Sequence, residues 1–289
     1  MMTENAVPED ASAPLASGVR AHYDRLDRFY RQLWGEHVHH GLWADPSFTP
    51  GEAVRHLVRR VAGDAGIEEG SRVCDVGCGY GAPARLWARA YGAEVTGFTV
   101  SAAQHAYAGA QTVEGPSPEY RLQDVLENDL PDGTFDAVVA VESLTHIRDQ
   151  PAVVREAARL LRPGGRFVAC VWMADAAPSR WQRRFLLDPI VEEGRLSGLP
   201  TASELHRWAS DAGLRVERLD DVTSLVRRTW SVVLRRFLRA LVTDPTVLRT
   251  LLDASESERV FARTIPRIWL AQHVGALRYG WLVATQERS

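Results

Sequence analysis

Hydrophobic positions along the middle of the chain follow two alternating periods. Short apolar runs of strand length lie at 72–76, 94–100, 120–122, 135–141 and 166–173. Segments with helical periodicity lie between them, at 84–91, 102–112 and 151–161. Strands that alternate with helices of this length predict βαβ units, and therefore a doubly wound α/β fold with a mostly parallel sheet. Right-handed crossovers then place the ligand crevice at the carboxyl ends of the strands.

The pattern loosens beyond residue 173 but stays largely helical. We expect helices at 179–193 and 202–212, and strands at 214–219 and 277–284. The long amphipathic region from 225 to about 273 is rich in Trp, Leu and Arg. It is apolar and aromatic enough to close over a large apolar molecule, and we predict that it forms a helical substrate lid.

The N-terminal part of the chain divides into a tail and a helical cap. Residues 1–17 are rich in Ala, Pro, Ser and acidic side chains without periodicity, which predicts a disordered tail. An N-terminal helical cap is predicted over 18–63. It has one helix on each side of an aromatic, histidine-rich loop at 37–43. The remaining residues, 64–289, form the predicted core.

Composition changes this picture little. The chain is 45% hydrophobic and 25% charged with a formal net charge of -3, which is ordinary for a soluble globular protein and gives no reason to expect nucleic acid. Lysine is absent, a bias that indicates GC-rich codons and a bacterial source. Because no signal sequence or membrane span is evident, a cytoplasmic protein is expected. Cys74, Cys78 and Cys170 are too few for a disulfide framework, and no metal site is predicted.

A glycine-rich turn follows the first predicted strand. Glycines at 77, 79 and 81 let the backbone turn sharply and approach a ligand closely. One interpretation is a dinucleotide fingerprint, which requires an acid about 20 residues further on to bind the ribose. That position is Thr99, so the confirming carboxylate is missing.

A methyltransferase site explains more of the surrounding residues. Asp75, just before the turn, can hold the ammonium group of a cofactor, directly or through water or backbone. Asp124 ends the third strand, where a carboxylate can accept a hydrogen bond from the exocyclic amine of adenine. Asp124 is also suited to cap a turn or helix, but its combination with Asp75 and the glycines favours a cofactor site.

Five motifs carry a resemblance to a known family. They lie at 34–43, 75–81, 97–104, 141–147 and 161–165, within a match from about Tyr23 to Ala284. On these residues the chain resembles the class I S-adenosylmethionine-dependent methyltransferases, and among them the branch of γ-tocopherol C-methyltransferases and related sterol and small-molecule enzymes. The resemblance implies a Rossmann-like, seven-stranded sheet whose last strand is antiparallel, with S-adenosylmethionine over the first two strands.

The resemblance also implies which residues contact this cofactor. They are Tyr23, Asp75, Gly77, Cys78, Gly79, Thr99, Val100, Gln104, Asp124, Val125 and Glu142. Tyr23 would seal the site from the first helix. Thr99 departs from the general class, in which an acid binds the ribose, but it agrees with the nearer branch.

The sequence leaves two kinds of chemistry open. Methyl transfer from a sulfonium is a direct displacement, so a protein mainly aligns the nucleophile, the methyl group and the leaving sulfur. A hydroxyl nucleophile benefits from a general base, for which His146 is a candidate; its alternative role is to shape the pocket at a helix start. Resemblance to sugar O-methyltransferases would supply an adjacent histidine and a partner aspartate. Thr145 replaces that histidine and strand 167–172 ends without the aspartate, which argues against an O-methylation dyad.

A carbon nucleophile would leave a cation that aromatic faces stabilise before a base removes a proton. Most of the nine tryptophans are expected in the core, but several fall near the predicted crevice. We therefore predict C-methylation of an isoprenoid-bearing or aromatic small molecule in a bacterial secondary-metabolite pathway. The predicted catalytic residues are Glu142 and His146. The predicted substrate residues are Trp34, His40, Trp172 and Trp230.

Two alternatives remain at this point. One is O- or N-methylation of a similar natural-product acceptor, which the position of the new methyl group would distinguish. The other is a protein of the same fold that does not methylate, such as a cyclase or a cofactor-binding subunit. The apolar first helix and the aromatic loop also make a homo-oligomer possible.

Overall fold

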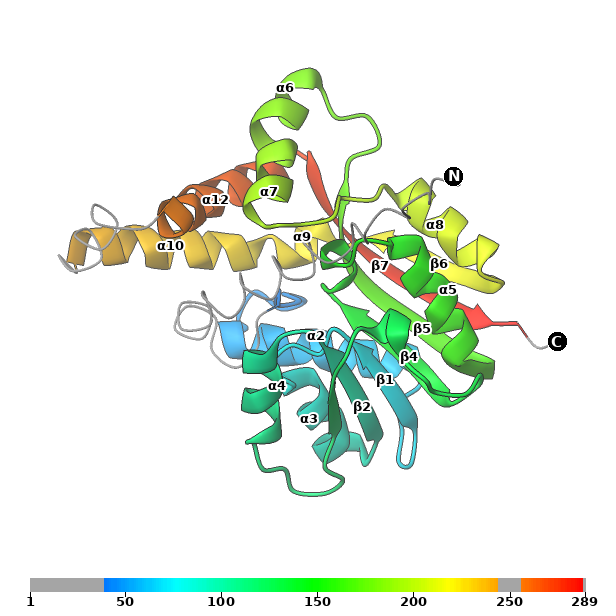
Figure 1. Ribbon diagram of the computed structural model, residues 1–289. Coiled ribbons are helices and arrows are strands. Elements are labelled where there is room, and N and C mark those ends of the chain that lie inside the picture. The colour runs from blue at the N-terminus through cyan, green and yellow to red at the C-terminus, as the bar shows by residue number, and fades with distance from the viewer. Residues whose placement is uncertain (1–38, 244–255, 288–289) are drawn as a thin grey trace, which may run out of the picture.

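The computed structural model describes residues 39–243 and 256–287. The predicted tail, the first predicted helix, Tyr23 and Trp34 lie outside these residues. Within them, strands and helices alternate in the predicted order, with helices on both sides of a central sheet (Figure 1).

The described residues form one seven-stranded sheet in the order β3-β2-β1-β4-β5-β7-β6. Its strands are β1 (Arg72–Val76), β2 (Glu94–Thr99), β3 (Glu119–Leu122), β4 (Phe135–Val141), β5 (Leu161–Ala174), β6 (Leu214–Asp221) and β7 (Leu277–Gln286). The first five strands pair in parallel, whereas β7 runs antiparallel to both of its neighbours. The expected Rossmann-like sheet is therefore confirmed. Its strand order reverses between β1 and β4, which is where sheets of this class bind ligands.

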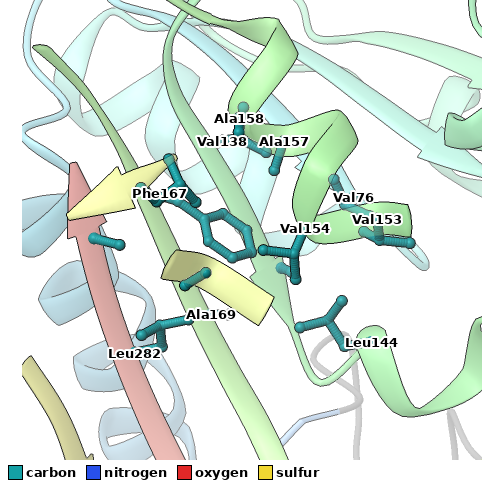
Figure 2. Packing of buried hydrophobic residues seen from close by; sticks show 14 of the residues in the cluster. Val76, Val138, Leu144, Val153, Val154, Ala157, Ala158, Phe167, Ala169 and Leu282 are labelled. Atoms are coloured by element: carbon teal, nitrogen blue, oxygen red, sulfur yellow. The ribbon is translucent and has the colours of Figure 1, made fainter. Parts of the chain in front are cut away.

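Helices cover both faces of the sheet. They are α2 (Pro50–Ala65), α3 (Ala82–Tyr91), α4 (Ala102–Gly109), α5 (Gln150–Leu160) and α8 (Ala202–Asp211). On β5, Phe167 and Ala169 pack with α5 and α8 (Figure 2), whereas Val168 and Cys170 pack in the cluster of α2 and α3. Neighbouring positions on a strand point to opposite faces, so this uninterrupted apolar run belongs to a strand that is buried on both sides.

Two boundaries differ from the prediction by three residues or more. The helix expected at 102–112 ends at Gly109, a residue type with low helix propensity. β5 begins at Leu161 instead of residue 166, because Leu161 already pairs with Phe135 before an irregularity in the register. Neither difference moves a predicted site residue off its strand end.

A second helical layer lies beside the sheet, where α10 and α12 run next to each other (Figure 1). It consists of α6 (Arg180–Gln182), the π-helical turn η3 (Arg183–Leu187), α7 (Asp188–Glu193), α9 (Thr223–Val226), α10 (Arg228–Thr243) and α12 (Glu256–His273). Its own apolar core includes Leu186, Ile190, Trp230 and Ile265. The described parts of the region 225–273 are thus helical, as predicted; that they cover a substrate stays a prediction. None of the described helices is long and apolar enough to cross a membrane.

Candidate active site

The turn after β1 adopts the left-handed backbone that its glycines predict. Gly77, Gly79 and Gly81 have φ angles of 72°, 55° and 73°, which residues with side chains rarely adopt. A Cβ atom on Gly77 would lie 2.5 Å from the Cβ of Ser143, whereas a Cβ on Gly79 would meet no atom of the described residues within 4 Å. The turn is therefore packed against the segment after β4 at Gly77 and open to a ligand at Gly79.

Asp75, near the carboxyl end of β1, is a buried carboxyl group with an unused oxygen. It is 2% exposed, and its Oδ2 has no hydrogen-bond partner among the residues that the structure describes. Burial raises the pKa of Asp75 to about 7. A buried carboxylate is costly without a partner, so this oxygen fits the ammonium group of the cofactor that the resemblance implies.

Alanine at the two glycines is expected to separate folding from cofactor binding. Gly77→Ala combines backbone strain with an overlap against Ser143 and should lower the free energy of unfolding by roughly 2–4 kcal/mol. Gly79→Ala adds only the strain, about 1 kcal/mol, but places a methyl group in the open space. Thermal unfolding and calorimetric titration with S-adenosylhomocysteine measure the two effects. Unchanged affinity in Gly79→Ala would place the cofactor elsewhere.

The end of β2 carries a hydroxyl–amide pair where dinucleotide sites have an acid. The Thr99 hydroxyl donates to Oε1 of Gln104 at 2.8 Å, and both side chains are buried. Ser101 caps α4 by accepting from the Gln104 backbone N–H at 3.3 Å. The backbone N–H of Cys78 donates to the Phe98 carbonyl at 2.9 Å, which joins the glycine turn to β2. These contacts bring the predicted residues of the two strand ends next to each other.

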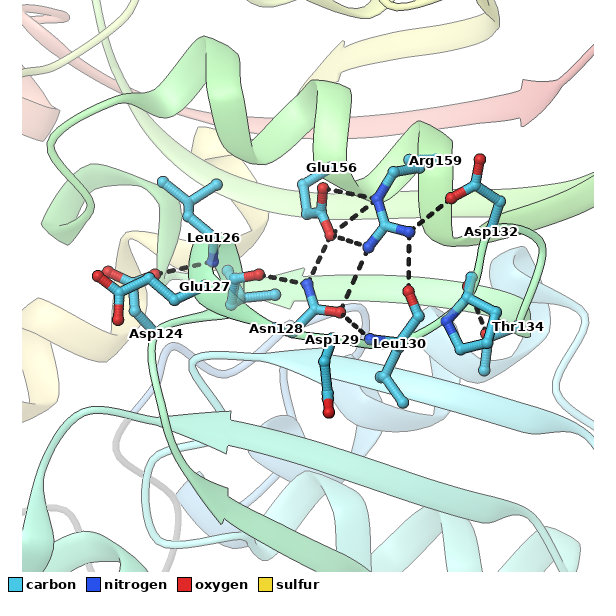
Figure 3. Close-up of polar contacts among 12 residues, drawn as sticks. Asp124, Leu126, Glu127, Asn128, Asp129, Leu130, Asp132, Thr134, Glu156 and Arg159 are labelled. Carbon is cyan, nitrogen blue, oxygen red and sulfur yellow. Dashed lines mark hydrogen bonds and ion pairs between the residues drawn. The ribbon is translucent and has the colours of Figure 1, made fainter.

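Asp124 caps the short helix η1 (Val125–Glu127), which was one of its two predicted roles. Its Oδ1 accepts from the Leu126 backbone N–H at 3.0 Å (Figure 3). Asn128 follows η1 and accepts from Arg159 of α5 at 3.3 Å, which ties this loop to the helix. Capping uses only Oδ1 of Asp124. That the second carboxylate oxygen accepts a hydrogen bond from the amine of adenine stays a prediction.

Asp124→Ala is expected to weaken both folding and cofactor binding. Loss of the cap costs about 1 kcal/mol of stability, and loss of an adenine contact should lower affinity for S-adenosylhomocysteine about tenfold. Asp124→Asn keeps a capping oxygen and removes the charge. Thermal unfolding should therefore recover in Asp124→Asn, while calorimetric affinity stays below that of the wild type. Equal affinity in the wild type and both variants would mean that Asp124 only caps η1 and does not contact the cofactor.

Glu142 is the centre of a second cluster, directly after β4. Its carboxylate accepts from the backbone N–H of His40 at 2.7 Å, Nδ1 of His40 at 3.0 Å, Nε1 of Trp172 at 3.3 Å and the hydroxyl of Tyr279 at 2.8 Å. Its φ of 58° is a left-handed conformation that strains a residue with a side chain. Burial alone would raise the pKa of Glu142, but His40 and the other donors hold it at about 2.

His40 links this carboxylate to the second helical layer. Its Nε2 accepts from the indole N–H of Trp230 on α10 at 2.7 Å and lies 3.4 Å from Nε2 of Gln272 on α12. The rings of Trp172, Trp230 and Tyr279 surround the imidazole, with centroids 5.5, 5.9 and 5.0 Å away. His40 is 2% exposed, so a polar cluster is enclosed by aromatic side chains.

The structure brings together some predicted residues that are far apart in sequence. Glu142, His40, Trp172 and Trp230 form one cluster, although they were predicted for different roles. Val100 follows β2, Val125 is the buried first residue of η1, and the half-buried His146 ends the short helix η2 (Leu144–His146).

Sequence reasoning missed Tyr279 and Gln272, which contact the cluster from β7 and α12. The one signal for Tyr279 was a hydroxyl inside a largely apolar strand. Among the described residues, no group of three or more His, Cys, Asp or Glu side chains could hold a metal ion.

Comparisons with known proteins agree with this geometry. A family model described as a methyltransferase domain matches residues 47–219. A 27-O-demethylrifamycin SV methyltransferase of Amycolatopsis mediterranei is 33% identical over 228 residues, covering 78% of this chain and 83% of the relative. A chloroplastic tocopherol O-methyltransferase of Arabidopsis thaliana is 27% identical over 81% of this chain and 73% of its own length.

A solved structure shows that the fold alone does not decide the reaction. The cyclase SpnF superposes with a TM-score of 0.78 at 25% identity, covering 96% of this chain and 98% of the cyclase. The family match and the methyltransferase relatives go beyond the fold, and Asp75 with the open turn at Gly79 fits their cofactor. The chain therefore belongs to the S-adenosylmethionine-dependent methyltransferases.

Proposed function

We propose that the chain transfers the methyl group of S-adenosylmethionine to a hydroxyl oxygen of a bulky, mostly apolar secondary metabolite. The observation that supports this reaction is the pairing of His40 with the Glu142 carboxylate at the carboxyl end of β4. The sequence argued against O-methylation because no histidine–carboxylate pair was evident near His146. The histidine and the carboxylate come instead from segments 102 residues apart. The argument against O-methylation therefore no longer holds.

The names of the two relatives support oxygen as the nucleophile. The first relative is named for a 27-O-demethyl acceptor, and the second is named a tocopherol O-methyltransferase. Aromatic side chains support a large apolar acceptor. Trp172 and Trp230 lie edge to face with ring centroids 6.0 Å apart, next to the apolar core of the second helical layer. An acceptor that reaches His40 therefore meets aromatic surface on two sides.

The same tryptophans favour a second candidate, the C-methylation expected from the sequence. Transfer to an alkene or an electron-rich ring leaves a cation on the acceptor, which aromatic faces stabilise. Trp172 and Trp230 flank the site where such a cation would form if the acceptor lies against His40. In that reaction a base removes a proton only after the methyl group has been transferred.

The position of the transferred methyl group tests the proposal. The purified protein is incubated with methyl-labelled S-adenosylmethionine and three acceptors: 27-O-demethylrifamycin SV, γ-tocopherol and a terpene hydrocarbon without a hydroxyl. We expect label in an O-methyl group of a hydroxyl-bearing acceptor and none in the hydrocarbon. Label on carbon would favour the second candidate instead. Binding of S-adenosylhomocysteine without turnover of any acceptor would argue against the proposed acceptor class.

A further inference from the structure

We propose that His40 is the general base of the transfer and that Glu142 is the residue that positions it. This inference rests on the proposed O-methylation. His40 was predicted only as a substrate contact, and Glu142 as a candidate for proton removal. The contacts of the two side chains favour a different division of roles.

Hydrogen bonds on both sides of the ring set the tautomer of His40. Nδ1 lies 3.0 Å from each Glu142 carboxylate oxygen, which can only accept, so Nδ1 carries the proton. Nε2 lies 2.7 Å from the Trp230 indole nitrogen, which can only donate. The lone pair of Nε2 therefore points toward the second helical layer. This is the arrangement that a histidine base requires.

The backbone around His40 is fixed as firmly as its ring. The N–H of Gly41 donates to the Thr229 hydroxyl at 3.0 Å, and that of Leu42 donates to the Ala53 carbonyl at 2.9 Å. A Cβ on Gly41 would lie 2.7 Å from that of Ala53, so the loop is packed directly on α2. A base held by this many contacts keeps its geometry without rearrangement during the reaction.

Glu142 is suited to orient and to balance charge, but it is a poor proton acceptor. Four donor groups already occupy its carboxylate. Its pKa of about 2 means that it remains ionised and gains little by taking a proton near neutrality. A permanent anion beside Nδ1 instead stabilises the positive charge that His40 acquires when Nε2 is protonated.

In the reaction, the acceptor hydroxyl takes the place of the Trp230 indole N–H at Nε2 of His40. Nε2 keeps one hydrogen bond in this exchange, so its cost is that of moving the Trp230 indole N–H away from its acceptor. Nε2 takes the hydroxyl proton as the oxygen forms its bond to the methyl carbon and the carbon–sulfur bond breaks, with its electron pair left on sulfur. The products are the methyl ether, S-adenosylhomocysteine and a protonated His40, which returns its proton to water after release.

His40→Asn is the first test. The asparagine amide can still donate to Glu142 but contains no basic nitrogen. With the acceptor methylated in the labelling experiment, beginning with 27-O-demethylrifamycin SV, we expect kcat to fall at least ~100-fold while the affinity for S-adenosylhomocysteine stays within about threefold. His206→Asn on the exposed side of α8 is the matched control and should leave both unchanged.

Small-molecule rescue separates a base from a space-filling ring. His40→Gly leaves a space for imidazole, and added imidazole should restore kcat at least about tenfold. Pyrazole has the same shape but is a much weaker base, so it should fill the space without restoring turnover. Equal rescue by the two compounds would overturn the role of His40 as a base.

The tautomer gives a readout that does not depend on turnover. Nitrogen-15 spectra of histidine-labelled protein should show the His40 proton on Nδ1, and a proton on Nε2 would contradict the inference. The two proposals also fail differently. If the wild type attaches no methyl group to oxygen, the proposed function is wrong. If it methylates oxygen and His40→Asn keeps kcat within about threefold, only the assignment of the base is wrong.

Discussion

An Asp75→Asn variant should bind S-adenosylhomocysteine on the order of 30-fold more weakly than the wild type, although it unfolds less readily at about pH 8. The loss of affinity follows from the unused carboxylate oxygen, which we propose pairs with the ammonium group of the cofactor. The gain in stability follows from burial. In the cofactor-free wild type a carboxylate must be ionised inside the protein, whereas asparagine has no charge to bury.

The pH dependence has a definite sign. Because the pKa of Asp75 is raised from 3.8 to about 7 by burial, the folded protein binds more protons than the unfolded chain between these values. Stability should therefore decrease as pH rises through this window, by up to about 4 kcal/mol for a shift of this size. Cofactor binding requires the ionised form, so affinity should rise up to pH 7 or so and then level off.

Calorimetric titrations in two buffers with different ionisation enthalpies measure the protons released on binding. Near pH 6 the wild type should release most of a proton, and Asp75→Asn should release none. Asp211→Asn, an exposed substitution at the end of α8, is the control and should match the wild type. Proton release that persists in Asp75→Asn would assign the titration to another group.

The fold was predictable because its signals are local. The apolar run at β5 predicts a strand covered on both faces, and the structure places Phe167 and Val168 in separate apolar clusters. Asp75, Thr99 and Asp124 were found as candidates because the carboxyl ends of parallel strands meet at one edge. For these residues, a place at the end of a predicted strand is enough to predict a place at the ligand-binding edge of the sheet.

The cluster around Glu142 was not predictable in the same way. Its donors His40 and Tyr279 lie 102 and 137 residues away, and nothing local to Glu142 indicates either one. Only the packing of the loop at 39–43 on α2, and of β7 beside β5, brings them together. The sequence could name His40, Trp172 and Trp230 as functional candidates, but not which side chain each one contacts. That is why a histidine–carboxylate pair was sought near His146 and not found.

Glu142→Ala is expected to lower the free energy of unfolding by about 3–5 kcal/mol, because it leaves the donors of buried His40 and Tyr279 and of half-buried Trp172 without their acceptor. For a chain of this length the melting temperature should fall by roughly 10 °C. Glu142→Gly removes the same carboxylate but relieves the left-handed backbone strain, so it should be about 1 kcal/mol more stable than Glu142→Ala.

The pH profile gives an independent check, because Glu142 and Asp75 titrate in opposite senses and in windows that overlap only between about pH 3.8 and 4.5. The pKa of Glu142 is lowered from 4.5 to about 2, so its stabilisation is complete above about pH 4.5 and is lost as pH falls toward 2. Urea unfolding of the wild type should lose up to about 3 kcal/mol across that window, and Glu142→Ala should lack this loss. A variant that keeps the acid-sensitive step would mean that the carboxylate is not held by these donors. A Glu142→Ala variant as stable as the wild type would mean that the cluster contributes to the reaction and not to stability.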